Sequence, residues 1–246
     1  MEERTLANGR VQQVDFLPLA IATMQGEARC VAGLDVNAGS WVRPVVRGYR
    51  CLFQEQVAQF KPDHIHRLAL GGSQPRSPDE DPLGYHTEDR PLVEIGRRSG
   101  PITPALKIQI LERTCDSDLA QVIKSGSRSL FAVQPETFSY REDDAAGARF
   151  LFSSSLPVTR HTGGRRCTLE EQRIAVGSAG PKCTCPRWLE FARARWAGRS
   201  VNEDLLRRSF PDARMYLVVS LSALYEDYYW LIVAAVHVVQ EDKTWL

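Results

Sequence analysis

The sequence predicts a mainly β protein of barrel or sandwich type. Most apolar residues occur in short runs that end at Gly, Pro, Asn or Asp, a pattern typical of strands joined by turns. Helical periodicity is confined to two short segments, Asp116–Ser125 and Pro186–Ala197. The composition, with 43% hydrophobic and 25% charged residues, is that of a folded globular protein. The 246 residues suffice for one large domain or for two of about 120 residues each.

Ten apolar segments are expected to form strands. They are Phe16–Met24, Arg29–Asp35, Trp41–Val46, Leu92–Gly96, Ala105–Arg113, Arg149–Ser153, Leu156–Arg160, Arg173–Val176, Met215–Leu221 and Tyr228–Val239. The clearest expected helix, Pro186–Ala197, starts with a proline, places Trp188 and Trp196 on one face and is followed by Gly198. The other begins at a capping Asp or Ser and has Leu119, Val122 and Ile123 at helical spacing.

Two polar stretches are expected to be loops. Leu70–Tyr85 is rich in Gly, Pro, Ser and Asp, which are the residues that favour turns. Tyr140–Gly147 is the second such stretch and lies near the middle of the chain. We therefore expect it to separate two halves, residues 1–140 and 148–246.

The segment RCVAGLDVNAGSWVRPV, residues 29–45, is expected to be a hairpin. Gly33 inside its first strand requires a bulge, a bend or a close backbone contact. After the turn, Trp41 and Arg43 point to the same face. They could form an exposed platform that stacks bases and binds phosphate. Alternatively, Trp41 packs in the core and Arg43 pairs with an acid, which the spacing alone favours because strand aromatics are mostly packing residues.

The same segment resembles the prokaryotic dual OB-domain-containing protein family, which has an Arg-Cys-Val/Ile-Ala-Gly strand followed by Trp-Ile/Val-Arg-Pro-Val. Two further stretches, YHTEDR at residues 85–90 and YLVVSLSALYEDYYWLIVAAVHVV at residues 216–239, resemble other segments of that family. This chain departs from the family pattern at Thr23, Met24, Thr87 and Trp230. The resemblance implies two tandem OB-like barrels, at 1–140 and 148–246, with a few short helices. It also implies a place in a defence or mobile-element system.

The charge balance limits the modes of nucleic-acid binding. With 31 basic and 30 acidic residues the net charge is +1, so binding would need a local basic groove. The loop RHTGGRR offers one, because Arg160, Arg165 and Arg166 flank two glycines and could clamp phosphates.

The segment HTED offers an acid–base trio of His86, Glu88 and Asp89. In a metal-dependent nuclease or nucleotide hydrolase, a loop of this kind would contain the catalytic groups. In the alternative interpretation, His86 and Glu88 fix the loop to the barrel by hydrogen bonds. The sequence contains no nucleophile elbow, P-loop, dinucleotide fingerprint or His-Glu-x-x-His motif, which weighs against the common enzyme classes.

Cysteine spacing gives a weak indication of zinc. Cys183 and Cys185, with Cys167 and His161 earlier, could supply four ligands, but the Cys-x-Cys spacing departs from the usual zinc knuckle. We therefore expect no cofactor, with zinc as the alternative. No apolar run reaches 18 residues and no secretory signal is present, so we expect a cytoplasmic protein with reduced thiols and no membrane contact.

Together these patterns favour non-catalytic binding of single-stranded nucleic acid or a nucleotide. The residues expected to contact it are Trp41, Arg43, Arg160, Arg165 and Arg166. Two alternatives stay open: an enzyme that uses His86, Glu88 and Asp89, and a protein-interaction module that binds a protein partner in a multi-component system.

Overall fold

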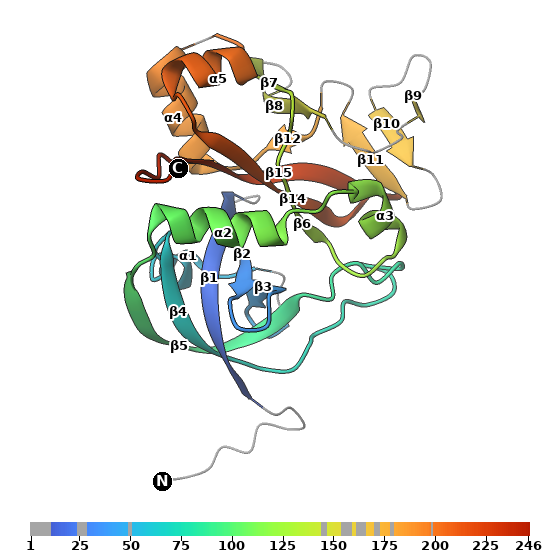
Figure 1. Ribbon diagram of the computed structural model, residues 1–246. Helices are drawn as coiled ribbons and strands as arrows, with labels where there is room; N and C mark the ends of the chain where they lie inside the picture. Colours follow the sequence, from blue (N-terminus) through green and yellow to red (C-terminus); the bar gives the residue numbers. More distant parts are fainter. Residues whose placement is uncertain are drawn as a thin grey trace.

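The structure is a computed structural model. It describes residues 11–23, 29–48, 51–143, 147–153, 159–160, 166–169, 173–177, 180–197 and 199–246. At residues 143, 159–160 and 166–169 it describes the backbone alone. The protein is mainly β, with a closed five-stranded barrel and a second, larger sheet, an architecture consistent with OB-like barrels (Figure 1).

The N-terminal half forms the closed barrel. Its strands are β1 (Gln12–Thr23), β2 (Arg29–Asp35), β3 (Ser40–Val45), β4 (His64–Leu70) and β5 (Asp89–Pro101). They follow the order β1-β2-β3-β5-β4, and β4 returns to pair with β1. The β3–β5 pair is parallel, whereas the other neighbouring strands are antiparallel. The short helix α1 (Gln54–Val57) follows β3 in the chain.

The second sheet has ten strands within the described residues. They are β6 (Leu130–Val133), β7 (Phe138–Asp143), β8 (Gly147–Phe152), β9 (Thr159–Arg160), β10 (Arg166–Leu169), β11 (Ile174–Gly177), β12 (Lys182–Cys183), β13 (Val201–Asn202), β14 (Arg214–Tyr225) and β15 (Tyr228–Val239). The main path runs β13-β7-β8-β12-β15-β11-β10-β9, and β14 pairs with both β15 and β6. The long β14–β15 hairpin therefore lies at the centre of this sheet and connects β6 to the main path.

Four further helices border the two sheets: α2 (Pro104–Thr114), α3 (Leu119–Lys124), α4 (Pro186–Trp196) and α5 (Glu203–Ser209). Figure 1 shows α2 along the boundary between barrel and second sheet. The prediction of a strand at 105–113 was wrong. Thr103 caps this segment by accepting a hydrogen bond from the Leu106 N–H, Pro104 occupies the first turn, and Ile108 and Leu111 are buried on one face.

The second expected loop, at 140–147, is a tight hairpin. Strands β7 and β8 pair from Phe138↔Phe152 to Asp143↔Gly147, so only residues 144–146 lie between them. Strands β6 and β7 begin before residue 140, yet both belong to the second sheet. The chain thus enters the second sheet upstream of the expected boundary. The short strands β6 and β7 were not expected from the sequence.

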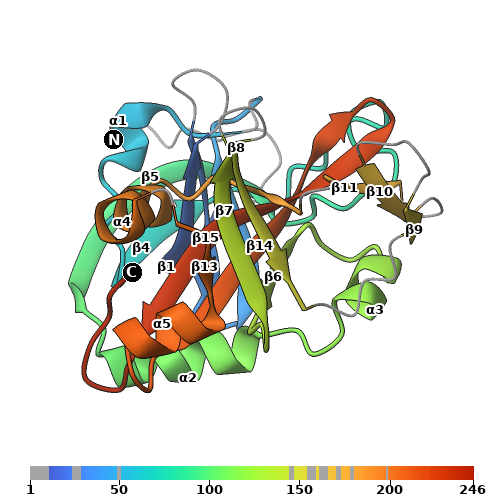
Figure 2. The ribbon, with the colours of Figure 1, turned by 90° about the horizontal axis from the view of Figure 1, so that it is seen from above.

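Two hydrophobic cores form in different places. The smaller core fills the barrel with Phe16, Val31, Val42, Leu52 and Leu68 among others. The larger core contains Ala32, Leu34 and Trp41 from the outer face of β2 and β3, together with Phe131, Leu217 and Val219 from the second sheet. One face of the barrel is therefore packed against the second sheet. Figure 2 shows the barrel strands and the β14–β15 hairpin superposed when seen from above.

Gly33 lies at the bulge of β1, as the sequence predicted for a glycine inside a strand. The register of β1 against β2 shifts between Pro18 and Ala20, and Gly33 pairs with Pro18. A Cβ atom at Gly33 would lie 2.0 Å from the Leu17 carbonyl oxygen. Only glycine allows this close approach of the two backbones.

Among the described residues, none of the helices has the length and apolar character needed to traverse a bilayer.

Candidate nucleic-acid interface

The Arg43 side chain is buried and bound to one acid, Asp89, as the second interpretation of the hairpin expected. It is 3% exposed, and its Nη1 donates to Asp89 Oδ1 at 2.7 Å. Arg76 Nε donates to the other oxygen of Asp89 at 2.8 Å, so one carboxylate binds two guanidinium groups. Arg43 Nη2 donates to Ser129 Oγ at 2.8 Å. Arg43 thus joins β3 and β5 of the barrel to the residue just before β6.

Glu88 makes a second link to the same segment. One of its oxygens accepts hydrogen bonds from the backbone N–H groups of Ser129, at 2.6 Å, and Leu130, at 2.9 Å. The other accepts from the Ser129 hydroxyl at 3.1 Å. Burial raises the pKa of Glu88, while Arg43 and these backbone donors act in the opposite direction. Both oxygens of the Glu88 carboxylate therefore accept hydrogen bonds that connect the barrel to the segment at the start of β6.

His86 lies in a third buried group, with Asp81 and Tyr229. Asp81 accepts hydrogen bonds from the His86 backbone N–H at 2.8 Å and from the Tyr229 hydroxyl at 2.7 Å. The His86 Nδ1 atom is 3.1 Å from Asp81 Oδ2. Burial alone would raise the pKa of Asp81, but the bonds from His86 and Tyr229 bring it below its usual range. Burial lowers the pKa of His86, and Asp81 opposes this shift.

These three groups form what we call the anchor network: Arg43, Arg76, Asp81, His86, Glu88, Asp89, Ser129 and Tyr229. His86, Glu88 and Asp89 are each 5% exposed or less, and each already has a partner. The geometry supports the interpretation in which His86 and Glu88 fix the loop between β4 and β5. These three residues are too buried for a substrate to reach them, which disfavours the alternative in which they act as catalytic acid and base. The sequence had not indicated Arg76, Asp81, Ser129 or Tyr229.

The expected solvent-facing platform does not form at Trp41 and Arg43. Trp41 is 6% exposed and belongs to the core between barrel and second sheet. Its indole therefore has no open face on which a base could stack, and Arg43 is bound by Asp89. The physical reason is that the second sheet covers the outer face of β2 and β3.

The two strands that flank the basic segment, β9 and β10, lie at the opposite side of the second sheet from β13. Arg160 ends β9 and Arg166 begins β10, and these strands pair through Arg160↔Cys167. Arg165 and His161 lie outside the described residues. Strand β10 pairs with β11, and Ala175 of β11 lies beside Trp230 of β15. The two arginine-bearing strands therefore belong to the same sheet as the turn end of the β14–β15 hairpin, to which β11 connects them.

The tip of that hairpin exposes aromatic side chains. Tyr225 is 65% exposed, Tyr228 and Trp230 are half-buried, and the Trp230 indole N–H donates to the Tyr225 carbonyl at 3.2 Å. The exposed Arg173 adjoins them, because its carbonyl accepts a hydrogen bond from Tyr229 N–H at 2.7 Å. We call β9, β10, Arg173, β11 and residues 224–230 the distal edge. Figures 1 and 2 both show these elements together at one end of the molecule.

The cysteines give no assembled metal site within the part of the chain that is described. No cluster of three or more His, Cys, Asp or Glu side chains suited to a metal occurs there. Cys183 and Cys185 are buried, and Cys185 Sγ caps α4 by accepting from the Trp188 N–H at 3.4 Å. Cys167 is described by its backbone alone, and His161 falls outside the described residues.

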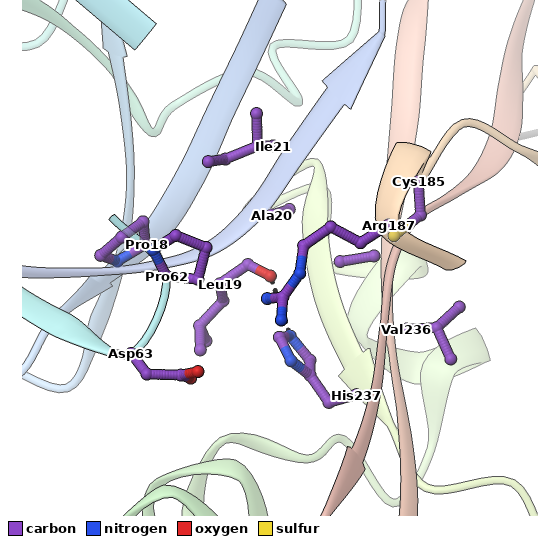
Figure 3. Close-up of a pocket in the computed structure, with 11 residues that line it drawn as sticks. Pro18, Leu19, Ala20, Ile21, Pro62, Asp63, Cys185, Arg187, Val236 and His237 are labelled. Carbon is purple, nitrogen blue, oxygen red and sulfur yellow. Dashed lines mark hydrogen bonds between the residues drawn. The ribbon is translucent and has the colours of Figure 1, made fainter. Parts of the chain in front are cut away.

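A small cavity lies between β1 and the second sheet (Figure 3). Its volume is about 30 Å³, enough for one or two water molecules. His237 and Arg187 point toward each other there, and His237 Nε2 is 2.8 Å from the Leu19 carbonyl oxygen. Such a volume does not accommodate a nucleotide, so we place the candidate interface at the distal edge.

Comparison with protein-family models, curated proteins and solved structures finds no match to this chain.

Proposed function

We propose that the protein binds single-stranded nucleic acid without catalysis, and that the distal edge is the contact surface. The observation behind this proposal is that the exposed ring of Tyr225 and the half-buried ring of Trp230 lie in the same sheet as the arginine-bearing strands. Proteins that bind single strands without sequence preference combine stacking rings with cationic groups that follow the backbone. Tyr225 and Trp230 would stack bases, while Arg173, Arg160 and Arg166 would bind phosphates.

The barrel has a different role in this proposal. The strand order and the parallel β3–β5 pair support an OB-like barrel, in keeping with the motif resemblance to dual OB-domain proteins. OB barrels commonly bind ligands on the face of strands 2 and 3. Here that face packs on the second sheet, so the ligand would bind to the second sheet instead.

Fluorescence anisotropy with a labelled single-stranded DNA of about 20 nucleotides tests the proposal, since one OB fold covers about 4–16 nucleotides. Affinity should fall steeply with salt, because phosphate contacts release counterions. Tyr225→Ala should weaken binding about fivefold or more, through the loss of one stacked base. Arg160→Ala combined with Arg166→Ala should weaken it and flatten the salt dependence.

The hairpin turn provides a variant that should strengthen binding. Glu226 and Asp227 are exposed at the tip, where they would repel phosphates. Glu226→Gln with Asp227→Asn should therefore raise affinity at low salt. Matched controls are Phe53→Ala, an aromatic that is 53% exposed beside α1, and Arg97→Ala on β5. Binding that is absent, or that responds equally to the control and distal-edge variants, would count against the proposal.

A further inference from the structure

Cys30 and Cys51 lie opposite each other across an antiparallel backbone contact. The Arg29 N–H donates to the Leu52 carbonyl at 3.4 Å, and the Leu52 N–H donates to the Arg29 carbonyl at 3.1 Å. Two residues that exchange both bonds form a hydrogen-bonded pair. In an antiparallel arrangement, the next pair along is one residue later on one side and one earlier on the other. That pair is Cys30 and Cys51.

The neighbouring hydrogen bonds define the kind of pair. The Cys51 carbonyl accepts from the Val46 N–H at 3.2 Å, so it points away from β2. Cys30 is in register with Ala22 on the other side of β2. The bridge at Arg29 and Leu52 is isolated and Cys51 lies in a bend, so Cys30 and Cys51 are not themselves a strand pair. Continuing the antiparallel geometry by one residue would make them a non-hydrogen-bonded position, at which Cα atoms are about 4.5 Å apart. Disulfides span Cα distances of about 4.4–6.8 Å, so little movement is needed.

The neighbouring residues indicate the direction of the two sulfurs. Leu52 and Val31 are fully buried inside the barrel. Because side chains alternate along a strand, the Cys30 side chain points to the opposite, outer face, and continuing the alternation back from Leu52 would point Cys51 to the same face. Both residues are half-buried free thiols.

We propose that Cys30 and Cys51 are an oxidative modification site, at which a peroxide converts the two thiols into a disulfide. One thiol reduces hydrogen peroxide, giving a sulfenic acid and one water. The second sulfur then attacks the sulfenic sulfur, forms the S–S bond and releases a second water. Two thiols and one peroxide thus yield one disulfide and two waters. The bond would fasten β2 to the segment that leads into α1.

The reaction needs no fixed order of the two sulfurs. Burial raises the pKa of the Cys30 thiol, although Arg43 opposes that shift. The sulfenic acid forms on one cysteine, and the thiol of the other resolves it. This proposal is independent of nucleic-acid binding at the distal edge.

The test treats the intact protein with a small excess of hydrogen peroxide. We expect the loss of two titratable thiols, a mass decrease of about two hydrogen atoms, and a tryptic cross-link between the Cys30 and Cys51 peptides. The thermal midpoint should rise by several degrees, and dithiothreitol should reverse every change. Cys51→Ser should abolish the cross-link. Cys115→Ser should retain it, because half-buried Cys115 lies opposite Ala132 at its own bridge.

Three results would overturn the proposal. They are sulfinic or sulfonic acid at Cys51 without a cross-link, a disulfide between two chains, and a cross-link of either residue to another cysteine. If Cys51→Ser fails to fold, the peptide map of the protein without substitutions still shows whether the Cys30–Cys51 cross-link forms.

Discussion

At the scale of single residues, Arg43 shows how the same side chain suits two opposite roles. An arginine two positions from a tryptophan on a strand fits a ligand platform, and it fits equally well a buried ion pair. The structure places Arg43 between Asp89 and Ser129, away from water. Burial alone would lower the pKa of Arg43, but Asp89 raises it above its ordinary value. The guanidinium therefore stays charged and joins the two parts of the fold.

Arg43→Ala should lower the free energy of unfolding by about 3–5 kcal/mol, because removing one partner of a buried ion pair leaves Asp89 Oδ1 without its donor and Ser129 Oγ without the donor from which it accepts. Urea denaturation would measure the change. Arg97→Ala, an exposed arginine of β5, should change stability by less than about 0.5 kcal/mol. Equal midpoints for the Arg43 variant and the unmodified protein would show that the anchor network does not hold the fold.

His237 makes stability depend on pH. Burial lowers its pKa well below the ordinary value, and Lys107 and Arg187 lower it further. The unfolded chain binds a proton at this histidine below pH ~6.5, whereas the folded protein does not. This contribution to stability is therefore fully present above pH ~6.5 and is lost as the pH falls, at about 1.4 kcal/mol per pH unit.

His237→Gln keeps a donor for the Leu19 carbonyl but cannot titrate. Between pH 7 and pH 5 the variant should lose about 2 kcal/mol less unfolding free energy than the unmodified protein. Paired urea titrations at the two pH values measure the difference between the two losses. The other buried titratable groups contribute equally to both proteins, so their contributions cancel in this difference. Identical losses for the two proteins would mean that His237 titrates normally in the folded state.

At the scale of elements, β1 and β2 depend on one glycine. The bulge at Pro18–Ala20 brings the two backbones so close that a Cβ at Gly33 would overlap the Leu17 carbonyl. Sequence reasoning identified the special character of Gly33 because its cause is local. It could not identify the contacting atom, which lies sixteen positions earlier in another strand.

Gly33→Ala should destabilise the protein by at least about 2 kcal/mol, because either the bulge or the β1–β2 register must shift. Thermal or urea unfolding measures the cost. Gly72→Ala is the matched control, since nothing lies within 4 Å of a Cβ there and its effect should be small. A Gly33 variant as stable as the control would show that the barrel relaxes easily at this bulge.

Segment 105–113 shows where local patterns mislead. Its alternating Leu106, Ile108 and Ile110 favour a strand. The proline at 104 and the Thr103 cap favour a helix, and the core contacts of Ile108 and Leu111 decide the outcome. Capping signals preceding an apolar run outweigh its apparent alternation here.

At the scale of the whole molecule, the barrel and the second sheet share one core. Ala32, Leu34 and Trp41 pack against strands β6 and β14 and their neighbours. The anchor network closes the same boundary with polar contacts. The second sheet therefore covers the outer β2–β3 face of the barrel, so this face is not available to a ligand.

A fragment of residues 1–124 should consequently fail to fold as the barrel does in the full chain. It would leave Leu34 and Trp41 uncovered, which we expect to cause aggregation, binding of a hydrophobic dye and a broad thermal transition. The full chain should unfold in one cooperative step without binding the dye. A monomeric fragment with a sharp transition and no dye binding would show that the barrel is an independent domain.

The sequence by itself determined the mainly β class, most long strands, the aromatic helix α4 and the special position of Gly33. These features depend on local spacing, capping and backbone sterics, which operate over a few residues. Only the tertiary structure decided that Trp41 and Arg43 are covered by the second sheet, and that His86 and Glu88 fix the loop between β4 and β5. The same structure brought the Tyr225 hairpin tip into one sheet with the strands of Arg160 and Arg166. Those outcomes depend on contacts between distant segments, and a local pattern contains no information about what will cover it.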